Sequence, residues 1–388
     1  MNESLFDSLP ASVIAEGRVT DAYFDRTLET LEYAGRDPTV VAEVTADQFP
    51  SGTYEVFAGA HEVAQLLSGL PVDVDALPVG QLFDGGPVLT IEGPYRAFLR
   101  FETALLGMLS PASGFATRAL AARLVAPDST LISFGSRHLH PAIAPVVERS
   151  ALIGGFDGIS NVAAGEILGV DATGTMPHAL MLVFGEDGTR DAWIAFHEAV
   201  DAAVPRIALC DTFTDEVVES LDAADALGDA LDGVRLDTTG SRRGNFAHIT
   251  REVRWKLDAA GYDSVDLFLS GGIDLESLDE LDAYADGFGI GSYITDAPPV
   301  NYALDIVEVD GEPVSKRGKL PGRKRVVRTD EGEHVVEPVD TAIPTDGEPL
   351  LEPLVRDGTV VRSIDMEDAA ARAMADAEVV DFDPWDHA

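Results

Sequence analysis

The 388-residue sequence contains one cysteine and four lysines, and each scarcity excludes a class of protein. With Cys210 alone, neither a disulfide framework nor a zinc site built from cysteines can form within the chain. Cys210 ends an apolar run, which is typical of a small buried residue rather than of a nucleophile. Aspartate and glutamate outnumber lysine and arginine by 68 to 27, and the formal net charge is −41. A chain of this charge repels a phosphate backbone, so no nucleic acid partner is expected.

Long apolar runs are also missing. No uninterrupted apolar stretch approaches the ~18 residues that a membrane helix needs. Residues 1–7 are acidic and lack the apolar part of a targeting segment. We therefore expect a soluble, cytoplasmic protein with no membrane partner. The length and a hydrophobic fraction of 46% predict two or three structural units with full cores.

The excess of acidic residues and the replacement of lysine by arginine are typical of an intracellular protein of a salt-accumulating halophile. At molar salt the Debye length falls to about 3 Å, so the repulsion within an acidic surface is screened. We expect low salt to loosen the fold.

Positive charge is concentrated in one segment. Lys316, Lys319 and Lys324 lie within nine residues, with three arginines interleaved. Gly318 and Pro321 in the same segment favour turns over a helix. Two interpretations stay open: the segment binds a phosphate or pyrophosphate, or it is an internal counter-ion patch that holds two acidic surfaces together.

Short apolar runs alternate with helical stretches between residues 129 and 295. This alternation predicts parallel βα units. We expect strands near 130–134, 207–210, 233–236, 265–269 and 287–290, and helices near 191–204, 215–227, 245–260 and 275–283. The polar and glycine-rich motifs fall at the carboxyl ends of these strands, the edge where an α/β barrel carries its active site.

The last two strand ends carry Ser270-Gly-Gly272 and Gly289-Ile-Gly-Ser292. Exposed backbone N–H groups in such loops can cradle a phosphate, and the last two loops of a barrel commonly do so. Either motif alone could equally be an ordinary tight turn.

Several motifs follow one another in a recognisable order: Thr20-Asp-Ala-Tyr23, Val88-Leu-Thr-Ile-Glu-Gly-Pro94, Phe101-Glu-Thr-Ala-Leu-Leu106, Phe134-Gly-Ser-Arg137, residues 154–161, Gly174-Thr-Met-Pro-His178, Asp211-Thr212, Arg235-Leu-Asp237, Ser270-Gly-Gly272 and residues 313–322. Together they resemble the nicotinate phosphoribosyltransferases of the short archaeal type, over about residues 20–358.

The resemblance implies an α/β fold: an irregular (β/α) barrel of the type II phosphoribosyltransferases, with an N-terminal α/β domain completed by chain that returns after the barrel. The expected boundaries are 1–106 for the N-terminal domain, 107–298 for the barrel with the active site, and 299–388 for the returning segment and an acidic C-terminal tail. The resemblance also implies a homodimer with active sites shared between the subunits.

The implied reaction joins nicotinate to phosphoribosyl pyrophosphate and gives nicotinate mononucleotide and pyrophosphate, in NAD biosynthesis. In the family, ATP hydrolysis is commonly coupled to this reaction through a phosphorylated histidine, which His178 matches. Gly174 and Thr175 would let His178 face the cavity, and at most one of His138 and His140 is expected to touch ligand. We expect Mg²⁺ to accompany phosphoribosyl pyrophosphate and ATP, and assign no metal-ligating residues of the protein.

For the leaving pyrophosphate the candidates are Arg137, Arg235, Lys316 and Lys319, since arginine forks suit oxyanions and lysine acts as a mobile point charge. Asp237 lies two residues from Arg235, so both side chains point to one face of a strand. Asp237 would hold the ribose hydroxyls or a magnesium–phosphate assembly. The alternative is a plain ion pair at the strand end.

The expected 5′-phosphate site combines backbone groups of the last two loops with nearby hydroxyls. Its members are Ser270, Gly271, Gly272, Gly289, Gly291 and Ser292. For the glycines, a role in the turns alone is the alternative.

Nicotinate recognition is expected at three positions. Ser160 stands where related nicotinamide enzymes carry an aspartate, and a neutral hydroxyl can donate to the carboxylate of nicotinate where an aspartate would repel it. Tyr23 would stack on the pyridine ring from the partner subunit, unless it is a core tyrosine. Asp21 is expected to orient a neighbour.

The sequence departs from the family after Asp237, where Thr-Thr-Gly-Ser replaces a continuation that carries a second carboxylate. Residues after about 330 are expected to form loops and to take no part in the chemistry. A helix is expected at 365–377, and the tail at 381–386 is expected to be solvated or loosely docked.

Two other functions stay open. One is a nicotinamide or quinolinate phosphoribosyltransferase of the same fold, although quinolinate would demand a second cluster of cations. The other is a non-catalytic phosphoribosyl-ligand sensor, which would need neither His178 nor Ser160.

Overall fold

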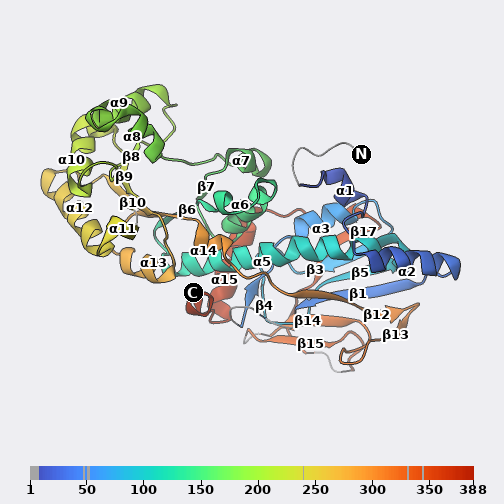
Figure 1. The fold of residues 1–388 in the computed structure, drawn as a ribbon. Helices are drawn as coiled ribbons and strands as arrows, with labels where there is room; N and C mark the ends of the chain where they lie inside the picture. Colours follow the sequence, from blue (N-terminus) through green and yellow to red (C-terminus); the bar gives the residue numbers. More distant parts are fainter. Residues whose placement is uncertain (1–7, 47–48, 50–52, 239, 330–331, 343–344) are drawn as a thin grey trace. The chain divides into compact units, whose positions relative to one another are not determined.

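The computed structural model divides the chain into two compact units (Figure 1). It describes residues 8–46, 49, 53–238, 240–329, 332–342 and 345–388, so residues 1–7, on which the expectation of no targeting segment rests, lie outside the described part. The first unit comprises Met1–Leu120, Ile153–Gly155 and Ala297–His387, and the second comprises Ala121–Leu152 and Phe156–Asp296. The first unit is therefore assembled from both ends of the chain.

A seven-stranded antiparallel sheet forms the centre of the first unit, in the order β13-β12-β1-β5-β3-β17-β18. Its strands are β1 (Thr39–Ala46), β3 (Asp73–Ala76), β5 (Pro87–Pro94), β12 (Tyr302–Val309), β13 (Glu312–Pro313), β17 (Glu352–Arg356) and β18 (Thr359–Val360). The returning strand β12 pairs with β1, with Val44 opposite Leu304, and β17 pairs with β3. Chain that follows the second unit thus completes the N-terminal sheet.

Both faces of this sheet are covered. The middle of β1 is buried on either side, which suits its run of valines. Figure 1 shows helix α3 (Ala60–Leu67) and the first part of α5 (Glu102–Val125) on one face, and β14 (Lys324–Arg328) and β15 (His334–Pro338) on the other. The remaining elements of this unit are α1 (Ala11–Ala15), α2 (Ala22–Tyr33), β2 (Glu55–Val56), β4 (Leu82–Phe83), α4 (Tyr95–Phe98), β16 (Glu348–Pro349) and α15 (Met366–Val379).

Two expectations for the C-terminal part hold only in part. Strands β15, β16, β17 and β18 form where only loop was expected, and β17 joins the large sheet, while the other described residues between 332 and 364 lie in turns and loops. In the tail, Asp381, Asp383, Trp385 and Asp386 are exposed as expected, but Phe382 and His387 are buried and stack on each other with ring centroids 4.7 Å apart. The strands of this region are short and of mixed polarity, and a contact between two rings involves only two residues. Neither produces the periodic pattern from which a strand or a packed segment can be predicted.

The second unit holds six parallel strands in the order β7-β6-β11-β10-β9-β8. They are β6 (Thr130–Ser133), β7 (Gly158–Ile159), β8 (Ile207–Leu209), β9 (Gly233–Leu236), β10 (Asp266–Ser270) and β11 (Gly287–Ile290). The helices of this unit are α6 (Ala144–Ile153, whose last residue belongs to the first unit), α7 (Val162–Leu168), α8 (His178–Phe184), α9 (Thr189–Ala199), α10 (Glu216–Leu227), α11 (Gly240–Arg243), α12 (Phe246–Ala260), α13 (Leu275–Leu281) and α14 (Ser292–Thr295).

The helices cover the outside of the strands in chain order, with α9, α10, α12 and α13 around β8, β9 and β10 (Figure 1). Polar caps fix where they begin: the side chain of Asn245 accepts from the N–H of His248 at the start of α12, and Asp274 and Ser277 form a reciprocal capping box on α13. Glycine in the left-handed conformation ends α12 at Gly261. Strand and helix positions agree with the expected ones to within a few residues at most ends.

The parallel sheet is the irregular barrel of the fold. Its two end strands, β7 and β8, have no hydrogen-bonded pairing with each other among the described residues. All carboxyl ends of the strands lie at one edge of the sheet, which is where the catalytic loops of such folds gather. Across the part of the chain that the structure describes, no helix is both long and apolar enough to cross a membrane.

The net charge of −41 predicts that the stability of this fold depends on salt. We expect the thermal midpoint to rise by about 10 °C or more between 0.1 M and 2 M KCl, because the Debye length shortens from about 10 Å to about 2 Å and the salt screens repulsion among carboxylates. Thermal melts followed by circular dichroism check this. Repeating them at pH 4.5, where part of the carboxylates are protonated, should flatten the dependence. A midpoint that does not move with KCl at pH 7 would contradict the halophilic interpretation.

Candidate active site

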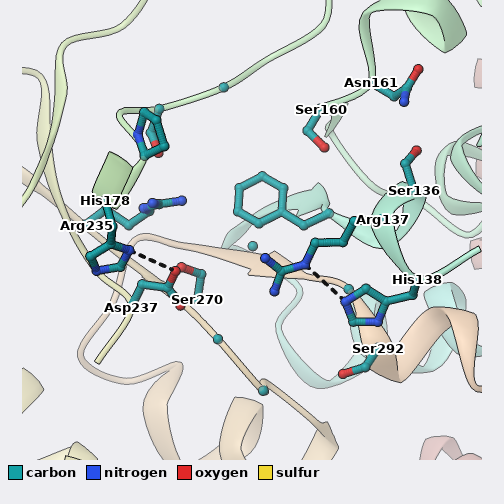
Figure 2. Close-up of a pocket in the computed structure, with 18 of the residues that line it drawn as sticks. Ser136, Arg137, His138, Ser160, Asn161, His178, Arg235, Asp237, Ser270 and Ser292 are labelled. Carbon is teal, nitrogen blue, oxygen red and sulfur yellow. Dashed lines mark hydrogen bonds and ion pairs between the residues drawn. The ribbon is translucent and has the colours of Figure 1, made fainter. Parts of the chain in front are cut away.

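A cavity of about 550 Å³ opens at the carboxyl ends of the barrel strands, entirely within the second unit (Figure 2). It is lined by twelve of the residues expected from the sequence: Arg137, Ser160, Thr175, His178, Arg235, Asp237, Ser270, Gly271, Gly272, Gly289, Gly291 and Ser292. Other lining residues include Phe134, Ser136, His138, Asn161, Met176 and Pro177. Residues far apart in sequence meet here because parallel strands end at the same edge.

His178 stands at the first turn of α8 and is held by a buried acid. Its Nε2 lies 2.9 Å from Oδ1 of Asp211, and its Nδ1 lies 4.0 Å from Oδ2 of Asp237. The side chain of Asp211 has no exposed area, and its other oxygen accepts from the N–H of Asp237 and the hydroxyl of Thr238. Burial raises the pKa of Asp211. As the acceptor, the carboxylate of Asp211 fixes the proton of His178 on Nε2 and leaves Nδ1 available.

Arg235, from β9, places a positive charge in the cavity lining that also holds His178. One terminal nitrogen donates to the carbonyl of Met176 at 3.0 Å, and the guanidinium lies 6.0 Å from the ring of Phe134. Burial lowers the pKa of Arg235. The Nε of Arg235 is buried and has no hydrogen-bond partner, and the same is true of Ser270 Oγ and Thr175 Oγ1. The three residues that carry these atoms line one cavity, and unpartnered buried polar atoms beside a cavity are a feature of sites that a ligand completes.

The glycine loops have different physical causes. Gly271 has a φ of +87°, and a Cβ there would overlap the carboxylate of Asp237. Gly289 has an ordinary φ, but a Cβ would overlap the ring of Phe134, so its absence lets that ring pack against the strand. The first loop therefore needs glycine for both its conformation and its close packing, and the second needs it for packing alone.

The opposite side of the cavity carries Arg137 and His138, which lie apart from His178 and Arg235 in the view of Figure 2. Arg137 Nε donates to His138 Nε2 at 3.2 Å. The preceding residue, Ser136, is held by a hydrogen bond: its hydroxyl donates to Glu148 at 2.5 Å. Burial raises the pKa of Glu148. His140 does not line the cavity and instead accepts from the N–H of Ala142, so of the two alternative histidines only His138 is placed for ligand contact.

The lysine-rich segment belongs to the first unit, and several of its cations are paired there with acids. Lys324 Nζ lies 2.7 Å from Glu43 inside the fold, and burial raises the pKa of Glu43. Arg323 binds Glu92 through two nitrogens, each at 2.7 Å. The counter-ion interpretation therefore describes this end of the segment.

The other end of the segment is more open. Lys316 Nζ lies 2.5 Å and Lys319 Nζ 3.6 Å from the carboxylate of Asp305, and the side chain of Lys316 is 64% exposed. Burial and the nearby Asp305 raise the pKa of Glu102 in the same region to about 7.

Asp21 and Tyr23 also lie in the first unit. Asp21 accepts from the hydroxyl of Thr103 at 3.1 Å. Tyr23 is 56% exposed and contacts Phe24 with ring centroids 4.3 Å apart. A core position for Tyr23 is thereby wrong.

Two important residues had no assigned role from the sequence. Asp211 was part of a motif, but its contact with His178 depends on a strand end and a helix start 33 positions apart. Arg243 contacts Ser270 and Gly271, although it lines no part of the cavity. Its only signal was the pair Arg242-Arg243 in a chain with few cations. Among the described residues no group of three or more histidine, cysteine, aspartate and glutamate side chains could hold a metal ion.

Comparison with known proteins agrees with this arrangement. Two family profiles match consecutive parts of the chain: the N-terminal domain of quinolinate phosphoribosyl transferase over residues 21–113 and its C-terminal domain over residues 115–305. The nicotinate phosphoribosyltransferase pncB1 of Mycobacterium tuberculosis is 31% identical over 322 residues, which cover 78% of this chain and 70% of that protein. The nicotinate phosphoribosyltransferase of Bacillus subtilis is 29% identical over 269 residues, covering 64% of this chain and 53% of that protein.

Solved structures share the fold. A nicotinate-nucleotide pyrophosphorylase from Pyrococcus furiosus superposes with a TM-score of 0.92 at 46% identity, covering 98% of this chain and 99% of that chain. Human nicotinic acid phosphoribosyltransferase superposes with a TM-score of 0.73 at 21% identity, covering 93% and 94%, which is a likeness of fold alone.

The fold and the cavity define a type II phosphoribosyltransferase, with a barrel and an N-terminal domain completed by returning chain. Within that class, the chain belongs to the nicotinate phosphoribosyltransferase family.

Proposed function

We propose that the protein transfers the phosphoribosyl group of phosphoribosyl pyrophosphate to nicotinate, as an enzyme of NAD biosynthesis. The observation that carries this proposal is that Thr175, Arg235 and Ser270, which line one cavity at the strand ends, each hold a buried polar atom without a hydrogen-bond partner. A pyrophosphate or phosphate ester offers the acceptor oxygens that Arg235 Nε and the two hydroxyls lack. The membership of the family, established by the M. tuberculosis relative, supports nicotinate as the acceptor.

In the proposed reaction, the ring nitrogen of nicotinate attacks C1 of the ribose while the bond from C1 to the pyrophosphate oxygen breaks. Pyrophosphate leaves with the electron pair, so negative charge grows on the leaving group. Arg235 and Arg137 stabilise that charge, and the backbone N–H groups of Gly271 and Gly272 hold the 5′-phosphate. Asp237, beside Gly271, faces the ribose hydroxyls.

ATP coupling is assigned to His178. Asp211 accepts a hydrogen bond from Nε2 of His178, so Nδ1 is the ring nitrogen with a free lone pair. Nδ1 would attack the terminal phosphorus of ATP, with ADP as the leaving group. Hydrolysis of the phosphohistidine returns the side chain to its first state. Oδ2 of Asp237 lies 4.0 Å from Nδ1, so the negative charge of a phosphate on Nδ1 would act on Asp237. Through Asp237, the phosphorylation state of His178 would affect the ribose site.

Mg²⁺ fits this site as a companion of the substrate phosphates. Magnesium commonly keeps several waters and binds through one or two carboxylates plus phosphate oxygens. Asp237 is the carboxylate of the cavity wall available for that role, because both oxygens of Asp211 are engaged. Bound magnesium would neutralise charge on the leaving group.

The proposed enzyme is a cytoplasmic homodimer. Tyr23, Asp21, Lys316 and Lys319 would be contributed to the cavity by the partner subunit, with Tyr23 against the pyridine ring and the lysines near pyrophosphate. The exposure of Tyr23 and Lys316 supports this role, since both are accessible on the first unit. Light scattering at molar KCl tests the assembly, and an active monomer would contradict it.

Selectivity for the acid form is assigned to Ser160. Replacing Ser160 by aspartate is expected to lower kcat/KM for nicotinate at least about a hundredfold, because two charges about 4 Å apart repel by about 4 kcal/mol at an effective dielectric constant of ~20. Steady-state kinetics with nicotinate and nicotinamide measure the effect.

The neighbour Asn161 offers a matched control. Asn161→Asp adds the same charge one residue away and keeps the cap on α7, where Asn161 accepts from the N–H of Ala164 at 2.9 Å. Equal losses in the two variants would refute a specific role for Ser160.

A second candidate is a quinolinate phosphoribosyltransferase, favoured by the description of the two matching domain profiles. The decisive assay offers nicotinate, nicotinamide and quinolinate separately to the protein in molar KCl with Mg²⁺ and phosphoribosyl pyrophosphate, with and without ATP. Nicotinate mononucleotide from nicotinate, increased by ATP, is the expected product. The same mononucleotide with carbon dioxide from quinolinate alone would favour the second candidate, and no product from any acceptor would favour a ligand sensor.

A further inference from the structure

Arg243 joins the loops that follow two neighbouring barrel strands. From α11, after β9, its Nε donates to the carbonyl of Thr238 at 3.0 Å. Its Nη2 reaches the loop after β10 and donates to the carbonyls of Ser270 at 3.1 Å and Gly271 at 2.5 Å. The guanidinium lies over the ring of Phe246, 4.1 Å from the centroid. One side chain is therefore fixed by three backbone carbonyls and an aromatic face.

These contacts determine which way the glycine turn presents its backbone. In a trans peptide the C=O and the N–H point in opposite directions, and the described residues contain no cis peptide bond. The carbonyls of Ser270 and Gly271 point to Arg243, so the N–H groups of Gly271 and Gly272 point away from it. Both glycines line the cavity and Arg243 does not. The donors of the turn are thus directed to the ligand side, and the repulsive carbonyls are directed to the guanidinium.

We propose that Arg243 is a positioning residue for phosphoribosyl pyrophosphate: it holds the Gly271-Gly272 turn so that its N–H groups meet the 5′-phosphate. This inference rests on the proposed function and extends it to a residue outside the cavity wall. Loss of Arg243 would remove the donor that holds the carbonyl of Gly271 away from the cavity, where that carbonyl would repel a phosphate.

The charges of Asp237 and Arg243 on either side of the Gly271-Gly272 turn also affect how it would bind an anion. A Cβ on Gly271 would meet both the carboxylate of Asp237 and, at 3.2 Å, Nη2 of Arg243, so the turn is packed between the two charges. Burial lowers the pKa of Arg243, and the nearby Asp237 opposes this shift. The positive charge behind the turn strengthens its donors toward an anion. A lysine would keep the charge but could not donate from a planar fork in two directions.

The test compares Arg243→Lys and Arg243→Gln with Arg242→Lys and Arg242→Gln in molar KCl. Arg242 is exposed on the same short helix. Its substitutions change the charge in the same way as those of Arg243, but at a residue for which no contact with the turn is found among the described residues. We expect KM for phosphoribosyl pyrophosphate to rise at least about tenfold in both Arg243 variants, since small displacements of positioning groups are costly. KM for nicotinate should stay within about twofold, and the Arg242 variants should resemble the wild type.

A measurement without turnover separates this inference from the proposed function. Inorganic phosphate is expected to raise the thermal midpoint of the wild type and of the Arg242 variants, and to leave the Arg243 variants unchanged. Equal protection in all proteins would overturn the inference, even if the wild type makes nicotinate mononucleotide. An equal rise of both KM values, or loss of folding in both Arg243 variants, would assign Arg243 to the fold alone and would also overturn it.

Discussion

Replacing His178 by alanine is expected to abolish ATP coupling while leaving a slow, ATP-independent synthesis of nicotinate mononucleotide. Phosphoryl transfer from ATP to the protein needs a nucleophile, and Nδ1 of His178 is the ring nitrogen that Asp211 leaves free. We expect substrate-stimulated ATP hydrolysis to fall by at least about a thousandfold, as when an essential nucleophile is removed. The transfer of the phosphoribosyl group itself should continue, because Arg235 and the glycine turn are untouched.

Three measurements check this prediction together: ADP release, transfer of the labelled terminal phosphate of ATP to the protein, and mononucleotide formation with and without ATP. His248→Ala is the matched control, since His248 is exposed on α12 and lines no part of the cavity. Asp211→Asn should give an intermediate loss, because an amide can also donate and no longer fixes the Nε2 proton. ATP stimulation that survives in His178→Ala would place the coupling elsewhere.

The barrel and the position of the site could be predicted from the sequence because both depend on local patterns. Buried parallel strands are short apolar runs, and the functional loops follow them directly. Arg235 and Asp237 illustrate this: two residues apart at the end of β9, they both line the cavity. The paired glycines after β10 could be recognised for the same reason, since a turn with two residues at positive φ has a strong preference for glycine.

Contacts between distant segments could not be predicted in this way. The pairing of Lys324 with Glu43 joins residues 281 positions apart, and the buried acid gives no periodic signal of its partner. The lysine-rich segment looked uniform in sequence, yet the structure neutralises Lys324 inside the fold and leaves Lys316 exposed. Arg243 was overlooked because its partners are carbonyl groups, which every residue possesses. Side-chain direction and backbone acceptors become visible only once the chain is folded.

Replacing Arg235 by methionine is expected to lower kcat/KM by about a hundredfold to a thousandfold without destabilising the free protein. The loss follows because a positioned cation no longer meets the charge that grows on the leaving pyrophosphate. The stability of the free protein should hardly change, since methionine keeps the apolar stem against Phe134 and removes a buried Nε that has no partner. The bond to the carbonyl of Met176 is lost, which offsets part of the gain.

Activity and thermal stability must therefore separate in this variant. We expect a thermal midpoint within about 3 °C of the wild type, and no further rise when pyrophosphate is added, whereas pyrophosphate should stabilise the wild type. Arg190→Met is the control, because Arg190 pairs with the exposed Asp225 at 2.8 Å on the surface of the same unit. If Arg235→Met melted many degrees lower and kept its response to pyrophosphate, Arg235 would be a structural residue. The unpartnered Nε would then have no bearing on ligand binding, and the strongest support for the proposed site would be lost.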